Sequence, residues 1–568
     1  MKQAKLIDFK NNTKALLSIV EKKADDGDFH SAIGMLRNAL KTSPKNTEIM
    51  LTLADTLGDV GFYEQAINVW FKYLTICSKN ERGNAYVGLA LNFLHINDSL
   101  AAAYYIEKNF TEFSPEEVNL EPFRDYFADE TFSELKNKGF MFYDDIKAGE
   151  YAEISSEIRK SALSDDIENA LKLLDKLPKN SVEYINGLIS CSIYYLMKED
   201  GKNALNYAKC AVEIDNNNFD AVCNISTVLF YIENYDKCAE YCIKAYQLAG
   251  DDVEKLNNLA TMFCQQNKHQ KAYEVFNKLQ SFTDMNLNML FLFGLVAYNV
   301  CDFKKSIECF RKVIQFSGDD RIAGYYLDMA IEKEKEGVLD KVTPFAYIFQ
   351  VPAVERQNRL KRIDKLLNEV RSGNYPKSIS NEDMSVLKWC FSTGEKELIK
   401  IATILMTSSI KPDFSYLLQM LLDVTFSNSN KRLLIRALAI CGYTKNIDFV
   451  AYSILRHVKF IKPSFFDSDI SSISILLTDA YAEAFSYTAL LTDKKIDFLP
   501  VVENLYVIFS SVYSATDDIP FDAKTIGAYI AEQCGLSQIA NITNVVGYFE
   551  GDALGYQKLK ELVEGFCL

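Results

Sequence analysis

The chain has 568 residues, of which 48% are hydrophobic and 24% are charged, a composition typical of folded protein and too apolar for a disordered chain. Its 11 prolines and 24 glycines exclude collagen-like and low-complexity classes and favour long helices over turn-rich β folds. The net charge of −15 argues against a nucleic-acid footprint over the whole chain. The charge is uneven, however, because residues 341–462 carry +9, whereas the segments before and after them carry −14 and −10.

The cysteines and the apolar segments predict a cytoplasmic location. None of the 13 cysteines is in a CxxC motif, and several fall in apolar helical stretches (Cys191, Cys223, Cys264), so we expect free thiols in a reducing compartment. Residues 1–20 lack the uninterrupted apolar core of a signal peptide. The most apolar stretch, Met289–Val300, is shorter than the roughly 20 residues that span a bilayer, so no membrane partner is expected.

Residues 1–110 contain a pattern that recurs at a fixed interval. Gly27-Asp28-Phe29 is followed by Ala32, and Gly61-Phe62-Tyr63 is followed by Ala66 at the same offset. A degenerate third unit is expected at about residues 84–110, with Ala102 or Ala103 at its helix crossing. Residues 111–150 then break the pattern and combine a charge of −7 with many aromatic residues. We expect an acidic aromatic helical insert or a degenerate repeat there.

Residues 151–336 show the same 34-residue period at five successive positions. The first position is small: Ala170, Ala204, Cys238, Ala272 and Ser306. Apolar or small residues follow it by four places (Leu174, Ala208, Cys242, Phe276, Phe310) and by seven (Leu177, Ala211, Ala245, Leu279, Val313). Such i, i+4, i+7 spacing predicts one buried helical face. Another small position lies twelve places earlier (Ser192, Ser226, Ala260, Gly294), which would let two helices cross closely.

This pattern resembles the tetratricopeptide repeat family, whose unit is a pair of antiparallel helices with small residues at the crossing and an aromatic residue in the turn. Tyr235 and Phe303 occupy that turn position here, and Leu36, Ala39 and Pro44 fit the N-terminal unit. The resemblance implies an all-α fold, in which a helical-hairpin solenoid covers residues 1–110 and 151–336. An irregular α-helical C-terminal domain is expected to follow it.

The resemblance also implies that the first helices form a concave groove for extended or helical peptide. Its positions map here to Asn186, Ile189, Ile193, Thr227, Phe230, Tyr231, Asn257, Thr261, Phe291, Leu295 and Tyr298. The groove positions contain no Lys or Arg, so an apolar or amphipathic peptide is expected, with Asn side chains bonding its backbone. Truncating Phe230, Phe291 or Tyr298 is expected to weaken peptide binding and preserve the fold. The alternative is that some of these side chains pack against the neighbouring repeat.

The chain after Gly337 changes character. Residues 337–380 are expected to form a linker in which Val342–Pro352 is extended and aromatic and Ala353–Arg371 is a basic amphipathic helix. Residues 381–568 are expected to form a run of helices, one of them over Phe449–Phe460.

A basic surface is predicted for the middle of the chain, from Arg356, Arg359, Lys361, Arg362, Lys431, Arg432, Arg436 and Lys459. It is either a solvated face, a face that docks on the chain's own acidic repeats, or a site for RNA or an acidic partner. The last possibility makes a regulator that contacts nucleic acid or an acidic partner through residues 353–462 the alternative function.

The sequence contains no motif for catalysis or for a metal site. No two of the four histidines lie within a helical turn of each other, and GxSxG, GxxxxGK[ST] and GxGxxG are absent. Cys238 and Cys242 are spaced to share a helix face, but they occupy core positions of their repeat. We therefore expect no catalytic residue, no metal and no cofactor. The predicted function is a non-catalytic scaffold that binds a protein or peptide partner.

Overall fold

The computed structural model describes residues 13–113, 123, 150–282, 285–319, 321–337, 342–376, 378–492, 494–514, 519–540 and 542–566. These residues fall into two compact units. The first, which we call the repeat unit, lies within Met1–Pro44, Asp55–Phe62 and Ala102–Pro352; the second, the mixed unit, lies within Lys45–Ala54, Tyr63–Ala101 and Ala353–Leu568. The expected insert at 111–150 lies outside the described residues except for 111–113, Phe123 and Glu150. No described helix is long and apolar enough to cross a membrane.

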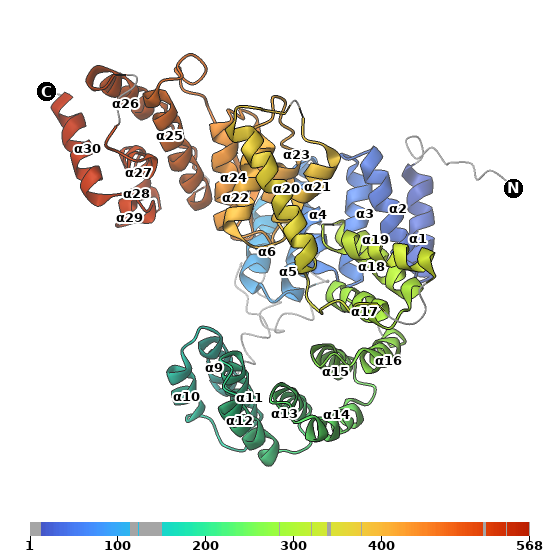
Figure 1. Ribbon diagram of the computed structural model, residues 1–568. Helices are drawn as coiled ribbons and strands as arrows, with labels where there is room; N and C mark the ends of the chain where they lie inside the picture. The colour runs from blue at the N-terminus through green and yellow to red at the C-terminus, as the bar shows by residue number, and fades with distance from the viewer. Residues whose placement is uncertain are drawn as a thin grey trace. The chain divides into compact units, whose positions relative to one another are not determined.

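Consecutive helices form the N-terminal region and the repeat array (Figure 1). The N-terminal helices are α1 (Thr13–Asp25), α2 (Phe29–Thr42), α3 (Thr47–Asp59), α4 (Tyr63–Leu74), α5 (Arg82–His95) and α6 (Ser99–Glu112), with a short 3-10 helix η2 (Lys79–Glu81). The array, which we define as α9–α19, comprises α9 (Glu150–Leu163), α10 (Ile167–Leu174), α11 (Val182–Met197), α12 (Gly201–Ile214), α13 (Phe219–Tyr231), α14 (Tyr235–Ala249), α15 (Val253–Gln265), α16 (His269–Gln280), α17 (Leu287–Asn299), α18 (Phe303–Ser317) and α19 (Ala323–Glu336).

The turn inside each hairpin of the array has the same backbone conformation. Its last residue before the cap has a positive φ of 54–68° at Asp165, Glu199, Glu233, Asn267 and Cys301, which occupy equivalent positions of successive repeats. The next residue caps the second helix, and Asp166, Asp200 and Asp302 each accept a bond of 3.1 Å from a backbone N–H three positions on. Left-handed φ is unfavourable for these side chains, so the cap and the packing of both helices must hold the turn.

The small residues lie where the two helices of a hairpin cross. The Ser192 hydroxyl donates to the Ala204 carbonyl at 2.9 Å, and the Ser306 hydroxyl donates to the Gly294 carbonyl at the same distance. A Cβ atom at Gly294 would lie 2.8 Å from the Phe310 ring, too close for a side chain larger than hydrogen. The predicted crossing positions are therefore confirmed at these hairpins, and their reason is close backbone approach.

The N-terminal hairpin α1–α2 packs on the last hairpin of the array within the repeat unit. Arg37 Nη2 donates to the Phe316 carbonyl, and Gln315 Nε2 donates to the His30 carbonyl, both at 2.6 Å. The Phe316 ring also contacts Phe62, with centroids 4.5 Å apart. The two hydrogen bonds join residues that are 279 and 285 residues apart in the chain.

The mixed unit combines helices with one β-hairpin. Its C-terminal part contains α20 (Ala353–Arg371), α21 (Asn381–Cys390), α22 (Lys396–Thr407), α23 (Ser415–Leu422), α24 (Asn428–Ile440), α25 (Ser472–Leu491), α26 (Leu499–Val512), α27 (Ala523–Gln533), α28 (Leu536–Ile539), α29 (Val545–Tyr548) and α30 (Ala553–Phe566). Asn68 of α4 joins it through two bonds: its Nδ2 donates to Asp423 at 3.1 Å, and its Oδ1 accepts from the Val424 N–H at 2.9 Å.

The expected helix over Phe449–Phe460 is wrong. Strands β1 (Asn446–Ala451) and β2 (Ile454–Lys459) form an antiparallel hairpin in which Asn446 is opposite Lys459. The two-residue turn has positive φ at Tyr452 and Ser453, the conformation that matches the twist of the flanking strands. The usual Asn-Gly or Asp-Gly signal for such a turn is missing, so the sequence gives no sign that the apolar run is divided into two strands.

Candidate functional site

The first helices of the array, α11, α13, α15 and α17, form what we call the inner face. Consecutive first helices pack on each other more closely than consecutive second helices do, which places them on the inner side of the stack. Because α13, α15 and α17 begin at the equivalent residues Phe219, Val253 and Leu287, corresponding side chains line up from repeat to repeat. This register makes Ile193, Thr227, Thr261 and Leu295 equivalent, as it does Met197, Tyr231, Gln265 and Asn299.

The inner face is open on α11, α13 and α15. The predicted residues Asn186, Ile189, Ile193, Thr227, Phe230, Tyr231, Asn257 and Thr261 are all exposed or half-buried there. Tyr231 is 60% exposed and Ile193 is 42% exposed, and the Phe230 ring contacts Tyr231 and Tyr235. The hydroxyls of Thr227 and Thr261 donate to carbonyls of their own helices at 3.0 Å. This part of the face therefore offers a ligand apolar and aromatic surface together with the amides of Asn186 and Asn257.

The same face is covered on α17. Phe291, Leu295 and Tyr298 are 1%, 0% and 3% exposed, so the expectation that they line an open groove is wrong. The cover is the non-helical segment Val342–Val351, which we call the 342–351 segment. Phe349 packs on Phe291 with ring centroids 4.5 Å apart, and Phe345 packs on Tyr298 at 4.4 Å.

Hydrogen bonds fix the backbone and one side chain of the 342–351 segment. Asn299 Nδ2 donates to the Phe345 carbonyl at 2.9 Å, and Asn299 Oδ1 accepts from the Phe345 N–H at 2.8 Å. The Tyr326 hydroxyl donates to the Gln350 carbonyl at 2.5 Å. His269 Nδ1 and the Tyr347 hydroxyl are 2.6 Å apart. Burial lowers the pKa of His269 and raises the pKa of Tyr347, so the neutral ring can accept the phenolic proton.

Sequence reasoning missed the partners of this segment. The groove residues predicted above include none of Asn299, Tyr326 of α19 and His269 of α16. One signal was available: Phe345, Tyr347 and Phe349 occupy every second position, the period at which side chains of an extended chain share a side.

The cysteine pair of α14 lies in the core. Cys238 and Cys242 are each 1% exposed, and their Sγ atoms are 4.0 Å apart. Lys268 Nζ lies 3.1 Å from Cys242 Sγ, and the Ser226 hydroxyl lies 3.2 Å from it. Within the described ranges, no group of three or more His, Cys, Asp or Glu side chains could hold a metal ion.

Most of the predicted basic surface is engaged within the mixed unit. Arg356 forms a bidentate pair with Glu395 at 2.8 and 2.9 Å, and Arg362 pairs with Asp383 at 2.6 Å and with Glu382. Arg359 pairs with Glu355 at 2.7 Å and lies over the Trp389 ring. The partners are carboxylates of the same unit rather than of the acidic repeats. Lys361 and Lys459 are exposed.

Arg432 and Arg436 of α24 share the buried carboxylate of Glu483 in α25. Glu483 is 5% exposed; Arg432 Nη1 donates to its Oε2 at 2.8 Å, and Arg436 Nε lies 2.7 Å from its Oε1 as an ion pair without hydrogen-bond alignment. Arg436 also pairs with Asp479. The Arg432 guanidinium lies 3.9 Å from the centroid of the Tyr487 ring. These two arginines hold α24 to α25.

Lys431 is not a surface residue, which corrects its place in the predicted basic surface. Its side chain is 1% exposed, and Nζ donates to the Val450 carbonyl of β1 at 2.7 Å. Burial lowers the pKa of this amine from 10.5 to about 8, partly opposed by Asp423. Lys431 lies beside Arg432 at the start of α24, and sequence alone does not distinguish its buried amine from that half-buried guanidinium.

A pH titration of Lys431→Met tests this burial. The folded pKa of Lys431 lies below the unfolded value, so between pH 8 and 10.5 the unfolded chain binds more protons and wild-type stability rises with pH, by up to about 3 kcal/mol. Lys431→Met lacks this rise, because methionine carries no titratable group. Urea unfolding followed by fluorescence measures it, since both tryptophans, Trp70 and Trp389, are in the mixed unit. Parallel pH profiles for the two proteins would contradict a buried amine.

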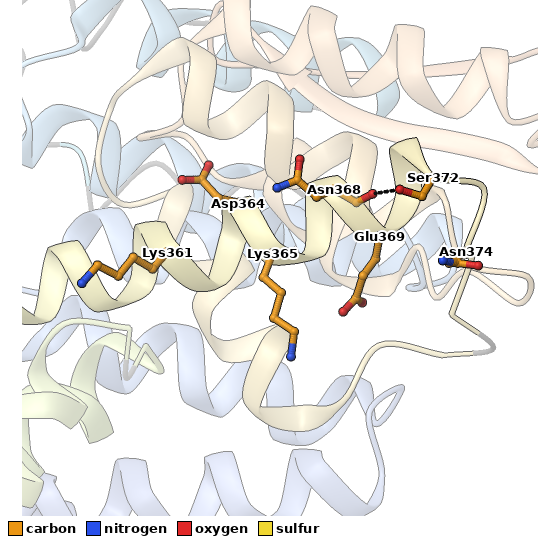
Figure 2. Close-up of a pocket in the computed structure, with 7 residues that line it drawn as sticks. All are labelled: Lys361, Asp364, Lys365, Asn368, Glu369, Ser372 and Asn374. Atoms are coloured by element: carbon orange, nitrogen blue, oxygen red, sulfur yellow. Dashed lines mark hydrogen bonds between the residues drawn. The ribbon is translucent and has the colours of Figure 1, made fainter.

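A shallow cleft runs along α20. It has a volume of about 530 Å³ and is lined by Lys361, Asp364, Lys365, Asn368, Glu369, Ser372 and Asn374 (Figure 2). All seven residues come from this helix and the turn after it, and the Ser372 hydroxyl donates to the Asn368 carbonyl at 2.8 Å. Carboxylates alternate with lysines, so the cleft has no net preference for an anion.

The regularly repeated hairpins, their small crossing residues and their capped second helices define the fold. It is a tetratricopeptide-type helical-hairpin solenoid followed by a largely α-helical region. Solenoids of this class generally act as protein–protein interaction modules, because stacked repeats present an extended surface.

Comparisons with known proteins accompany this assignment. No family model matches the sequence, and no curated protein matches it. The chain is similar to the solved structure of a tetratricopeptide repeat protein from Parabacteroides merdae, with 12% identity and a TM-score of 0.22 over 56% of this chain and 98% of that one. It is also similar to the TPR2AB domain of yeast Sti1 in its pHSP90 complex, with 13% identity and a TM-score of 0.18 over 52% of this chain and 95% of that one. A third similar structure is the APC/C hetero-tetramer Cut9–Hcn1, with 12% identity and a TM-score of 0.25 over 75% of this chain and 96% of that one.

Proposed function

We propose that this protein is a non-catalytic interaction scaffold whose inner face binds an extended, apolar or amphipathic peptide of a partner protein. The observation that carries the proposal is the 342–351 segment, a peptide of that chemistry that already lies on α17. The open part of the face on α11, α13 and α15 continues the same surface toward the N-terminus of the array. Its exposed Ile193, Met197 and Tyr231 provide apolar contacts for further peptide residues.

Two further features support this proposal. Every cysteine that the structure describes is a free thiol, which favours the reducing cytoplasm as the place of action. The alternative, a nucleic-acid contact through residues 353–462, is less favoured because Arg356, Arg362 and Arg432 already bind carboxylates. Neutralised guanidinium groups release few counterions from a phosphate backbone.

Peptide selection on two matched double variants tests the proposed site. A displayed library of random 12-residue peptides is selected on the full-length protein, and we expect sequences enriched in aromatic residues. Their affinity should fall by about 10-fold or more for Ile193→Ser/Tyr231→Ser, because each side chain supplies exposed apolar contact area. The control is Ile243→Ser/Tyr246→Ser on the second helix α14, whose side chains are 57% and 45% exposed. Equal losses for both variants, or no enrichment, would refute the inner-face site.

A further inference from the structure

The 342–351 segment is bound as a peptide ligand would be. In the chain it follows α19 and precedes α20, and it forms neither a helix nor a strand with a neighbour. Pro344 lacks a backbone N–H and restricts the residue before it to extended conformations. Along residues 344–348 the side chains alternate between exposed and half-buried, with Phe345 and Tyr347 directed to the protein and Pro344, Ala346 and Ile348 to solvent. Up to Ala346 this is the alternation of an extended chain with one side on a surface. At Tyr347 the chain makes a tight turn, in which the Ile348 N–H donates to the Ala346 carbonyl at 3.0 Å.

The backbone contact is independent of the bound sequence. Asn299 donates to the carbonyl and accepts from the N–H of the same residue, Phe345, so it recognises an extended peptide unit. Its amide also interacts with the Tyr347 hydroxyl. The Tyr326 hydroxyl adds a second backbone contact five positions further on, at the Gln350 carbonyl. A different peptide with the same backbone conformation can therefore form the same hydrogen bonds.

The side-chain contacts select aromatic residues at alternate positions. Phe345 lies in a cluster of Tyr298, Tyr325 and Tyr326, with centroids 4.4, 6.4 and 4.9 Å away. The Tyr347 hydroxyl meets His269, and the Phe349 ring lies on Phe291. The site thus provides an aromatic pocket, a hydroxyl partner and an aromatic platform in the order Phe-x-Tyr-x-Phe.

The segment is only partly buried, with Val351 3% exposed and Val342 and Phe345 packed against the core. Ile348 and Phe349 remain 54% and 52% exposed, and the hydrogen bonds described above hold the segment through three side chains of the array, Asn299, Tyr326 and His269. Because the segment belongs to the same chain, its effective concentration at the site is in the millimolar range, and any free peptide must compete against it.

We propose that α16, α17 and α19 form a peptide site for sequences with aromatic residues at alternate positions, and that the 342–351 segment is its resident ligand. A partner peptide of this chemistry binds by displacing the segment. The inference rests on the proposed function and names its partner class, yet it concerns α16, α17 and α19, whereas the test above concerns α11 and α13. Failure at Ile193 and Tyr231 with success here would confine binding to the last repeats.

The test uses a labelled peptide with the sequence of residues 342–352 and the full-length protein. In the variant Phe345→Ala/Tyr347→Ala/Phe349→Ala the site is vacated, and we expect it to bind the peptide at least about 10-fold more tightly than wild type does. Adding Asn299→Ala to the vacated variant should weaken binding by about 10-fold, since two hydrogen bonds are lost. The matched control is Gln265→Ala, an exposed amide at the equivalent position one repeat earlier.

The outcomes separate the proposal from a purely structural role of the segment. A peptide in which each aromatic residue is moved by one position should not bind the vacated variant. No binding to the vacated variant, equal binding to wild type, or equal effects of Asn299→Ala and Gln265→Ala would overturn the proposal. Should the triple variant not fold, hydrogen exchange of wild type decides: excess peptide should accelerate exchange at residues 342–352, and unchanged exchange would overturn displacement.

Discussion

Replacing Glu483 with alanine should lower the free energy of unfolding of the mixed unit by about 3–4 kcal/mol. Glu483 is 5% exposed and binds both Arg432 and Arg436, so its removal leaves two half-buried guanidinium groups short of their shared carboxylate. Asp479 still pairs with Arg436, which limits the loss. Arg432 retains its contact with the Tyr487 ring but loses the carboxylate to which it donates a hydrogen bond.

Urea unfolding followed by tryptophan fluorescence measures this loss, because Trp70 and Trp389 both report on the mixed unit. The matched control is Glu561→Ala on α30, an exposed glutamate whose contact with Gln557 is at the surface. We expect its effect to stay below about 0.5 kcal/mol. If Glu483→Ala were as mild as this control, the two arginines would not depend on the carboxylate and would be free for an outside partner.

Phe291→Ala should destabilise the repeat unit by about 3–5 kcal/mol. The side chain is 1% exposed and contacts three rings, Phe310, Tyr326 and Phe349, so truncation leaves a cavity between α17, α18 and α19. This result would differ from the expectation for an open groove residue, whose truncation weakens peptide binding and preserves stability.

The control for Phe291→Ala is Phe349→Ala, which truncates the ring that packs on Phe291. Phe349 is 52% exposed, so Phe349→Ala removes less buried area and should cost less than half as much. Thermal unfolding followed by far-UV circular dichroism compares the two, since the repeat unit contains no tryptophan. Equal costs for Phe291→Ala and Phe349→Ala would mean that the 342–351 segment is a full part of the core and not a ligand lying on it.

Residues that repeat at a fixed spacing could be interpreted from the sequence. Ser192 and Ser306 were identified as crossing residues because each recurs with small residues at the equivalent position of the next or previous repeat, and their hydroxyls do bond across the hairpin. The resemblance to tetratricopeptide repeats, mapped through the same register, places Ile193, Thr227 and Tyr231 on the inner face, where they are exposed or half-buried. Local period and helix geometry are sufficient for such assignments, because each hairpin contacts mainly its neighbours.

Residues whose surroundings come from distant parts of the chain could not be interpreted in this way. Phe291 and Tyr298 occupy the same register as open positions in earlier repeats, yet the 342–351 segment covers them. Lys431 and Arg432 are adjacent in a basic stretch, but Lys431 points to β1 and Arg432 to α25. A β-hairpin lies at 446–459 where a helix was expected. Its turn could not be predicted, because Tyr452 and Ser453 adopt positive φ without a glycine to indicate it.

The sequence by itself determined the repeat length, the helix pairs, their small crossing residues and the aromatic character of the inner face, because these depend on spacing along the chain. Only the tertiary structure decided which part of that face is open and which arginines are neutralised. The physical reason is that burial and ion pairing depend on segments far apart in sequence. Phe349 reaches Phe291 from beyond the last helix of the array, and Glu483 lies 51 residues after Arg432. The spacing of residues within a repeat does not predict such contacts.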